Sequence, residues 1–340
     1  MVIVMGTAAT DGDIQRVLER LTEYDCRGEL TVGVERTIIT VLGPKIPALQ
    51  EDVRVLPGVE NVVLLSKSYE LAGRESKPDG SVVTIDGVSF GGETLAIIAG
   101  PGTVESAAQI ETLAGELRQA GADMLMGGTM TPDQSPYAFR GLGEEGLQYL
   151  AQAREATGLL VVNEVVNVAQ LETVARYADV LEIGAYNMRN FGLLEVAAAT
   201  AKPIILRRGL SATIDDWLLS AEHILHAGNE RVILCESGIR TYESTMPSTT
   251  DVSAVPMLKR MTHLPVIVDP AHSAGDASLV GPLALAAVAA GVDGLMLSVH
   301  DNPDRALADG PQSLTPDRFH ALLASIAALA PTVGRQLVSA

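Results

Sequence analysis

The segment Leu95-Ala-Ile-Ile-Ala-Gly-Pro-Gly-Thr-Val-Glu-Ser106 joins an apolar run, typical of a buried strand, to a loop that contains glycine and proline. The same passage, followed by a helical pattern, recurs along the rest of the chain. The later candidate strands are Met124–Gly127, Leu159–Glu164, Val180–Ile183, Pro203–Arg207, Val232–Cys235, Pro265–Asp269 and Gly294–Val299. Eight strand–helix units in roughly 250 residues predict a closed (β/α)8 barrel.

Helix signals between these strands agree with this prediction. Thr213 can cap a helix with Asp216 in its first turn, and Thr315 precedes a proline at a first helical position. Alternation alone does not distinguish a barrel from an open doubly wound sheet, which stays the structural alternative. A dinucleotide-binding sheet is disfavoured, because no Gly-x-Gly-x-x-Gly turn follows the first strand.

The first seventy residues predict a separate small domain. Apolar runs at Val2–Met5, Thr31–Val34, Thr37–Leu42 and Val59–Leu65 indicate strands. Helical spacing covers Ile14 to Leu21, and Ile46–Val53 indicates a weaker helix broken by Pro47. The order βαββαβ predicts a ferredoxin-like α+β domain.

We place this domain at residues 1–72. Residues 73–92 then form a linker and a hairpin, Val82–Phe90, that plugs the bottom of the barrel, which occupies residues 93–340.

The chain has 340 residues, a formal net charge of -18 and two cysteines, Cys26 and Cys235. The negative charge opposes binding to nucleic acid or to an anionic membrane. So few cysteines indicate neither a disulfide framework nor a Cys-x-x-Cys metal site. We expect a cytoplasmic protein with a small-molecule substrate and no cofactor.

Several motifs identify a family. Beside Gly100-Pro-Gly-Thr-Val-Glu-Ser106 stand Gly127-Gly-Thr-Met-Thr-Pro-Asp-Gln-Ser-Pro-Tyr137, Asn187-Met-Arg-Asn-Phe191, Val268-Asp-Pro-Ala-His-Ser273 and Asp309-Gly-Pro-Gln-Ser313. In this order and spacing they resemble type I-beta 3-deoxy-D-arabino-heptulosonate 7-phosphate (DAHP) synthases along the whole chain. The resemblance implies a barrel with an N-terminal regulatory domain, and an aldol-like condensation of phosphoenolpyruvate with erythrose 4-phosphate.

The resemblance also implies a divalent metal held by Cys, His, Glu and Asp. The matching positions here carry Gly102, His272, Ser298 and Asp309. Two ligands remain where a catalytic site uses about three, so we expect no metal site of the inherited kind.

At positions where the family carries Arg or Lys for its phosphates, this chain carries Met126, Thr131, Asp133, Tyr186 and Ser237, and Arg207 replaces a lysine. Each lost charge-assisted contact is worth roughly 1.5 to 3 kcal/mol. This count leads us to expect no DAHP synthesis.

The chemistry of a barrel lies at the carboxyl ends of its strands. We therefore select Glu164, His272, His300 and Arg208 as catalytic candidates. The substrate-binding candidates are Met126, Ser135, Tyr137, Arg140, Tyr186, Asn187, Arg189, Arg207, Glu236, Asp269, Ser298 and Asp309.

Several of these residues keep two interpretations. Glu164 is either a general base or an orienting partner of Arg207 or Arg208. His300 either exchanges a proton with substrate or bonds a backbone group. Tyr137 and Tyr186 either contact a ligand or fill space. Arg240 and Glu236 are interpreted as a structural ion pair.

These observations favour an enzyme of DAHP-synthase ancestry that has been repurposed for metal-independent acid–base chemistry on a less phosphorylated metabolite, in specialised metabolism. The alternative is a catalytically silent binding or regulatory protein, and a genuine DAHP synthase ranks last. By its resemblance to the family's regulatory domain, the small domain is expected to hold a homotetramer or homodimer together.

Overall fold

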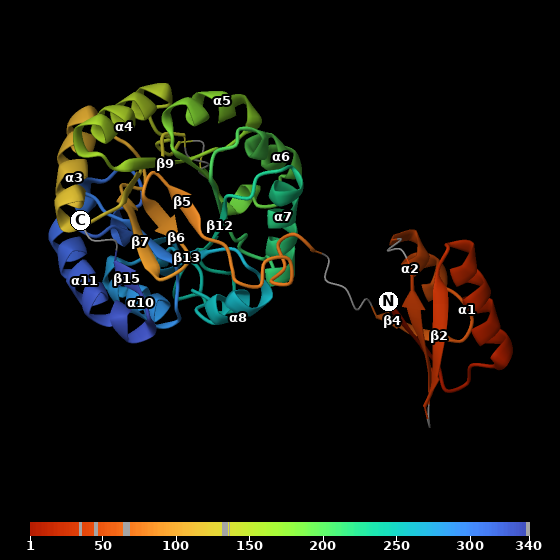
Figure 1. Cartoon of the computed structure of the whole chain (residues 1–340). Coiled ribbons are helices and arrows are strands. Elements are labelled where there is room, and N and C mark those ends of the chain that lie inside the picture. Colours follow the sequence, from red (N-terminus) through yellow and green to blue (C-terminus); the bar gives the residue numbers. More distant parts are fainter. Residues whose placement is uncertain (34–35, 44–46, 64–68, 131–134, 136, 338–340) are drawn as a thin grey trace. The chain divides into compact units, whose positions relative to one another are not determined.

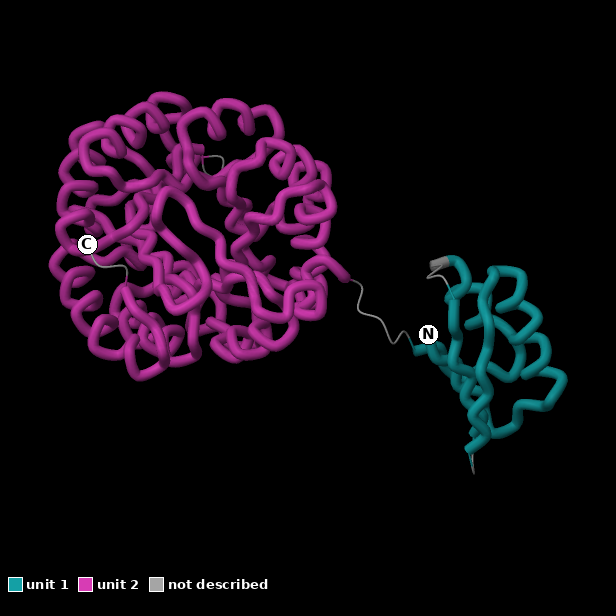
Figure 2. The backbone as a smooth tube through the Cα atoms, in the orientation of Figure 1, with its two compact units in different colours: residues 1–68 teal, residues 69–340 magenta. Residues whose placement is uncertain are grey.

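The structure is a computed structural model that describes residues 1–33, 36–43, 47–63, 69–130, 135 and 137–337. The chain forms two compact units, Met1–Ser68 and Tyr69–Ala340 (Figure 2). The first unit ends a few residues before the boundary at 72 that the sequence suggested.

The N-terminal unit is a ferredoxin-like sheet with two helices. Its elements are β1 (Val2–Met5), α1 (Asp11–Glu23), β2 (Arg27–Val32), β3 (Thr37–Leu42), α2 (Pro47–Arg54) and β4 (Val59–Val63). The strands are antiparallel in the order β2-β3-β1-β4. Pro47 begins α2 and does not break it, because the first helical position needs no backbone N–H.

Both helices pack on one face of this sheet. Val17 and Leu21 of α1 and Leu49 and Val53 of α2 form a buried cluster with inward residues such as Ile39. Since strand side chains alternate, every second residue points to the opposite face, which neither helix covers.

The second unit is a closed parallel barrel (Figure 1). Its strands are β7 (Thr94–Gly100), β8 (Met124–Met126), β9 (Leu160–Glu164), β10 (Val180–Ile183), β11 (Ile204–Arg207), β12 (Val232–Glu236), β13 (Val266–Val268) and β14 (Gly294–Ser298). Pairing of β14 with β7 closes the ring, with Gly294 opposite Ala96 and Ser298 opposite Gly100. The prediction of a (β/α)8 barrel with a ferredoxin-like domain is confirmed, and the open sheet is excluded.

Helices surround the barrel. They are α3 (Ala107–Ala120), α4 (Glu144–Thr157), α5 (Val168–Tyr177), α6 (Phe191–Ala199), α7 (Ile214–His226), α8 (Ala254–Met261), α10 (Ala277–Ala289) and α11 (Pro316–Leu329), with the short α9 (Pro270–Ala274) after β13. Thr213 and Asp216 form a capping box on α7, and Thr315 caps α11 ahead of Pro316. A short strand, β15 (Gln336–Leu337), pairs with the start of β7.

A hairpin closes one end of the barrel. It consists of β5 (Val83–Ile85) and β6 (Val88–Phe90). Its apolar side chains, Phe90 among them, form one buried cluster with inward residues of the barrel strands such as Ile98 and Ile205. This end is filled with side chains, so space for a ligand remains at the other end.

Three aspartates at the amino ends of strands fix neighbouring strands to each other. The carboxylate of Asp123, just before β8, accepts from the backbone N–H of Ile97 at 2.7 Å. Asp179 does the same for Val161 at 2.8 Å, and Asp293 for Val266 at 2.7 Å. Burial raises the pKa of Asp123 to about 6. The carboxylates at the amino ends of the strands therefore stabilise the barrel by joining neighbouring strands.

Within the described ranges, no helix combines the length and apolarity that crossing a bilayer requires.

Candidate active site

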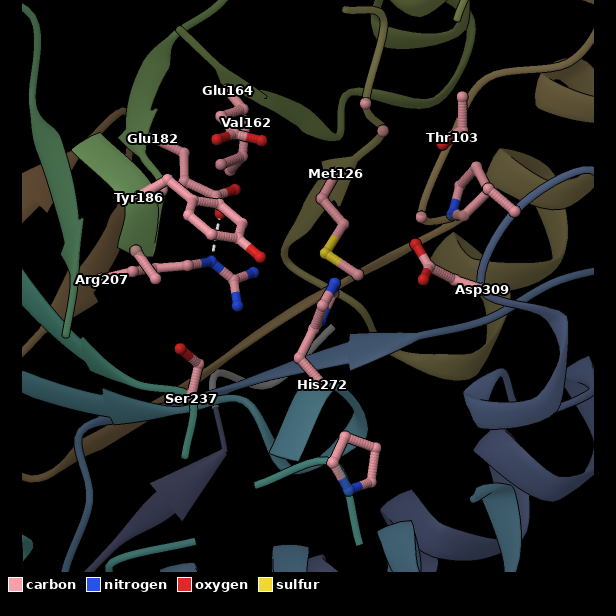
Figure 3. A pocket seen from close by; sticks show the side chains of 18 of the residues that line it. Thr103, Met126, Val162, Glu164, Glu182, Tyr186, Arg207, Ser237, His272 and Asp309 are labelled. Atoms are coloured by element: carbon pink, nitrogen blue, oxygen red, sulfur yellow. Dashed lines mark hydrogen bonds and ion pairs between the residues drawn. The ribbon is translucent and has the colours of Figure 1, made fainter. Parts of the chain in front are cut away.

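A cavity of about 630 Å³ opens at the carboxyl ends of the barrel strands. Figure 3 shows side chains from several strands and loops converging on it. Residues that line it include Gly102, Thr103, Met126, Glu164, Glu182, Tyr186, Arg207, Leu210, Ser237, Arg240, His272, Leu307 and Asp309.

Asp269 binds two residues that line the cavity, His272 and Arg207. It follows β13, is fully buried, and caps α9 by accepting from the backbone N–H of His272 at 3.0 Å. Its Oδ2 atom accepts from Nδ1 of His272 at 2.7 Å and lies 2.7 Å from Nη1 of Arg207. With Nδ1 engaged, His272 presents Nε2 to the cavity, as Figure 3 shows.

These contacts determine the protonation states of His272 and Asp269. Burial opposes the charged form of the His272 imidazole, but Asp269 outweighs it and raises the pKa of His272 above its ordinary value. Burial opposes ionisation of Asp269 as well, yet His272 and Arg207 hold its pKa far below the usual range. An ionised Asp269 thus favours a protonated His272.

Arg207 is bound on two sides. Its guanidinium pairs with Asp269 and, through Nε, with Glu182 of β10. Although burial opposes its charge, Glu182 and Asp269 raise the pKa of Arg207 well above its ordinary value. Two carboxylates thus hold one guanidinium, which still borders the cavity (Figure 3).

Glu164, at the end of β9, lines the cavity and has a raised pKa. Burial and the nearby Glu182 carboxylate raise its pKa to about 7, while Arg207 and His272 act in the opposite direction. A carboxyl group with this pKa exchanges a proton near neutral pH, as a general acid or base requires. The ion pairs of Arg207 are with Glu182 and Asp269, and those of Arg208 are with Glu236 and Asp251.

Of the four catalytic candidates from the sequence, the structure brings Glu164 and His272 to the cavity and places Arg208 and His300 elsewhere. Among the substrate-binding candidates, Met126, Tyr186, Arg207 and Asp309 line the cavity, whereas Asp269 does not line it but binds His272 and Arg207, which do.

Arg208 directly follows the last residue of β11, Arg207, and does not line the cavity. It binds Glu236 at 2.9 Å and Asp251 at 3.0 Å, and lies over the ring of Trp217. The ion pair that the sequence suggested between Glu236 and Arg240 is therefore wrong: Glu236 binds Arg208.

His300 borders a second, smaller cavity of about 470 Å³ together with Glu105. Ser298 is fully buried in β14. The remaining candidates do not line the first cavity, namely Ser135, Tyr137, Arg140, Asn187, Arg189 and Glu236. Tyr137 is 95% exposed, and the side-chain amide of Asn187 donates to the Val166 carbonyl. Thr131 and Asp133 lie outside the described residues.

Sequence reasoning missed Glu182. The signal was present, because a glutamate within the apolar run Val180-Leu-Glu-Ile183 must find a partner when it is buried. It also missed Leu210, Pro247, Ser248 and Leu307, which come from loops around the mouth.

The residues present do not fit the four-ligand metal site that the resemblance implies. Gly102 has no side chain, and a Cβ built on it would overlap the Oδ2 atom of Asp309. The Ser298 hydroxyl is buried without a hydrogen-bond partner among the described residues. Within the same part of the chain, no three His, Cys, Asp or Glu side chains gather as metal ligands do. His272 and Asp309 alone carry ligand atoms at the four positions.

Comparison with known proteins decides the family. Residues 75–332 match the family model described as the DAHP synthetase I family, and residues 1–67 match the DAHP synthase ferredoxin-like domain. The chain belongs to the DAHP synthetase I family. It is therefore an enzyme of the aldolase-type transferase class and acts on small molecules.

Individual relatives agree with the family. The phospho-2-dehydro-3-deoxyheptonate aldolase of Thermotoga maritima is 41% identical over 98% of this chain and 99% of its own length. A crystal structure of this DAHP synthase has a TM-score of 0.94 at 40% identity and covers 99% of both chains. A 2-dehydro-3-deoxyphosphooctonate aldolase of a Geobacter species is 35% identical over 71% of this chain and 94% of its own length.

These findings overturn the function that the sequence suggested. The expectation of a repurposed enzyme with metal-independent chemistry in specialised metabolism is wrong, as is the rank given to a genuine DAHP synthase. The comparisons give no sign of a diverged function, since identity near 40% extends over the whole chain. The error arose because the count of lost cations at a few positions of the pocket was given more weight than the resemblance along the whole chain.

The raised pKa of Glu164 generates a stability prediction. A carboxyl whose folded pKa is raised stabilises the fold fully below its ordinary pKa of 4.5, and this contribution is lost as pH rises toward 7. Relative to wild type, Glu164→Gln should therefore become more stable between pH 5 and 8, by up to roughly 3 kcal/mol. Urea unfolding at a series of pH values measures this difference. The exposed Glu172→Gln is the control, and a difference for Glu164→Gln that does not change with pH would contradict the assignment.

Proposed function

We propose that this protein is a DAHP synthase, which condenses phosphoenolpyruvate with erythrose 4-phosphate. The observation that carries the proposal is the identity of 41% with a DAHP synthase over 98% of the chain. A cavity at the carboxyl face of the barrel supports it, because barrel enzymes place their chemistry there.

The reaction joins the methylene carbon of phosphoenolpyruvate to the aldehyde carbon of the sugar phosphate. One water is consumed and inorganic phosphate leaves, so the product keeps the phosphate of the sugar. Two demands fall on the protein: binding of anionic substrates, and proton supply to the aldehyde oxygen as it gains charge.

Arg207 and Arg240 are suited to the first demand. Both line the cavity, and a guanidinium offers a fixed fork of donors to a carboxylate or phosphate. Arg207 is fixed in place by Glu182 and Asp269, so it can receive an anion without reorganising.

His272 and Glu164 are suited to the second demand. Asp269 holds the His272 ring and favours its charged form, which is the form that donates a proton. Glu164, with its pKa near 7, has a protonated fraction at neutral pH. We assign His272 as the group that protonates the aldehyde oxygen, and Glu164 as the group that restores its proton.

The wild-type protein should form DAHP and inorganic phosphate in equal amounts from the two substrates, in buffer that contains Mn²⁺. His272→Ala should lower kcat by roughly 10²- to 10⁴-fold, because it removes the proton donor. Phosphate release and product mass spectrometry measure both outcomes. His320→Ala, an exposed histidine on α11, is the matched control. Absence of product with wild type would contradict the proposal, and full activity of His272→Ala would contradict its assigned role.

We also propose that the site holds a divalent cation only loosely. His272 and Asp309 provide two ligands where catalytic sites use about three. Wild-type protein equilibrated with Mn²⁺ should lose it during desalting, as elemental analysis measures. About one equivalent that resists chelators and disappears in His272→Ala would contradict this.

The N-terminal unit supports a proposal of self-association, as a homotetramer or homodimer. The sheet face opposite the helices carries Val2, Val4, Ile38, Leu42 and Val63, of which Leu42 is 46% and Val63 40% exposed. An apolar sheet face of this kind is commonly buried against a second copy.

Light scattering at micromolar concentration should accordingly give the mass of a dimer or a tetramer of the 35.7 kDa chain. Leu42→Asp should shift the protein toward a smaller species, because a charge on this face opposes burial. Val55→Asp, at a residue 81% exposed just after α2, is the matched control. A monodisperse wild-type monomer would remove the idea.

A cytoplasmic location is part of the proposal. The chain has two cysteines, Cys26 and Cys235, and so few cysteines suit a reducing compartment.

A further inference from the structure

The loop between β14 and α11 closes on itself. Val299 and Leu314 form a bridge at its base, where the backbone N–H of His300 donates to the Leu314 carbonyl at 2.9 Å. Short 3-10 turns at Pro303–Arg305 and Gly310–Gln312 shape the loop. Its tip, Leu307 to Asp309, lines the main cavity. The position of this tip therefore decides the shape of one wall.

Glu105 holds the tip from a neighbouring loop. Its Oε1 atom accepts from the backbone N–H of Leu307 at 2.6 Å and lies 3.2 Å from Nε2 of His300. Glu105 belongs to the segment between β7 and α3 that also carries Gly102 and Thr103 of the cavity wall. One carboxylate thus joins the two loops that form this wall.

His300 is fixed in turn. The backbone N–H of Asn302 donates to its Nδ1 at 3.0 Å, and its Nε2 is in contact with Glu105. The side-chain nitrogen of Gln109 lies 2.8 Å from Nε2. The ring is 3% exposed and lies outside the main cavity.

The second cavity, bordered by Glu105, Gln109, His300 and Arg305, lies beside these contacts. At the tip the two loops touch directly, because the Asp309 carboxylate occupies the space that a side chain at Gly102 would need. Asp309 has a left-handed backbone with φ of 57°, which a free loop would seldom keep.

We propose that Glu105 and His300 are positioning residues, which hold Leu307 and Asp309 in the wall of the active-site cavity. Neither touches the reacting atoms. The inference rests on the proposed function only for its kinetic test, since the state of the loop is measurable without turnover.

Hydrogen–deuterium exchange tests the contact directly. In Glu105→Ala the amide of Leu307 loses its acceptor, so its exchange should become at least about tenfold faster. Glu105→Gln keeps an acceptor oxygen and should restore most of the protection. Glu111→Ala, an exposed glutamate on α3, is the matched control. Unchanged exchange at Leu307 in Glu105→Ala would overturn the proposal whether or not the protein makes DAHP.

Kinetics test the consequence. In Glu105→Ala and His300→Ala, KM for one of the two substrates should rise about tenfold, with a smaller change in kcat, because binding is affected and proton transfer is not. Glu105→Gln should return KM toward wild type. A fall in kcat of the size expected for His272→Ala would instead make either residue catalytic and overturn the positioning role. If Glu105→Ala speeds exchange at Leu307 but the wild-type protein makes no DAHP, the positioning role of Glu105 stands and only the proposed function is refuted.

Discussion

The active site depends on one buried carboxylate, Asp269. It joins a guanidinium, Arg207, to an imidazole, His272, and at the same time caps the helix that carries His272. A charge in a fully buried position is tolerated only with partners, and loss of one partner typically costs roughly 3 to 5 kcal/mol. The same attraction that pays for burying Asp269 therefore orients His272 and Arg207 toward the cavity.

Glu182 extends this network to a second carboxylate. Its pairing with Arg207 leaves Glu164 beside a negative charge, and burial acts in the same direction on the Glu164 pKa. Three acids in and beside one cavity thus have different states: Asp269 ionised, Glu182 paired, and Glu164 near its midpoint at neutral pH. Such separation by environment distinguishes acids that hold structure from those that transfer protons.

Most of the fold was predictable from sequence. Apolar runs of strand length alternate with segments of helical spacing, and few folds are compatible with eight such units. Every barrel strand was located to within a residue or two, whereas Pro47 was misjudged because a proline that breaks a helix also begins one. The site was harder to predict. Arg207 and Arg208 are adjacent, yet the first borders the cavity and the second pairs with Glu236. Two partners of His300, Glu105 and Gln109, are distant from it in sequence, so no local pattern shows them.

The β5–β6 hairpin, which closes one end of the barrel, has a consequence for how molecules enter and leave the cavity. With Phe90 and its neighbours filling the lower end, the cavity has its mouth at the carboxyl face, beside Tyr186 and Leu307. In the DAHP synthesis proposed above, two substrates and two products would use this one opening. The molecule that sits deepest has to arrive first and depart last, so the architecture itself favours an ordered sequence of binding and release.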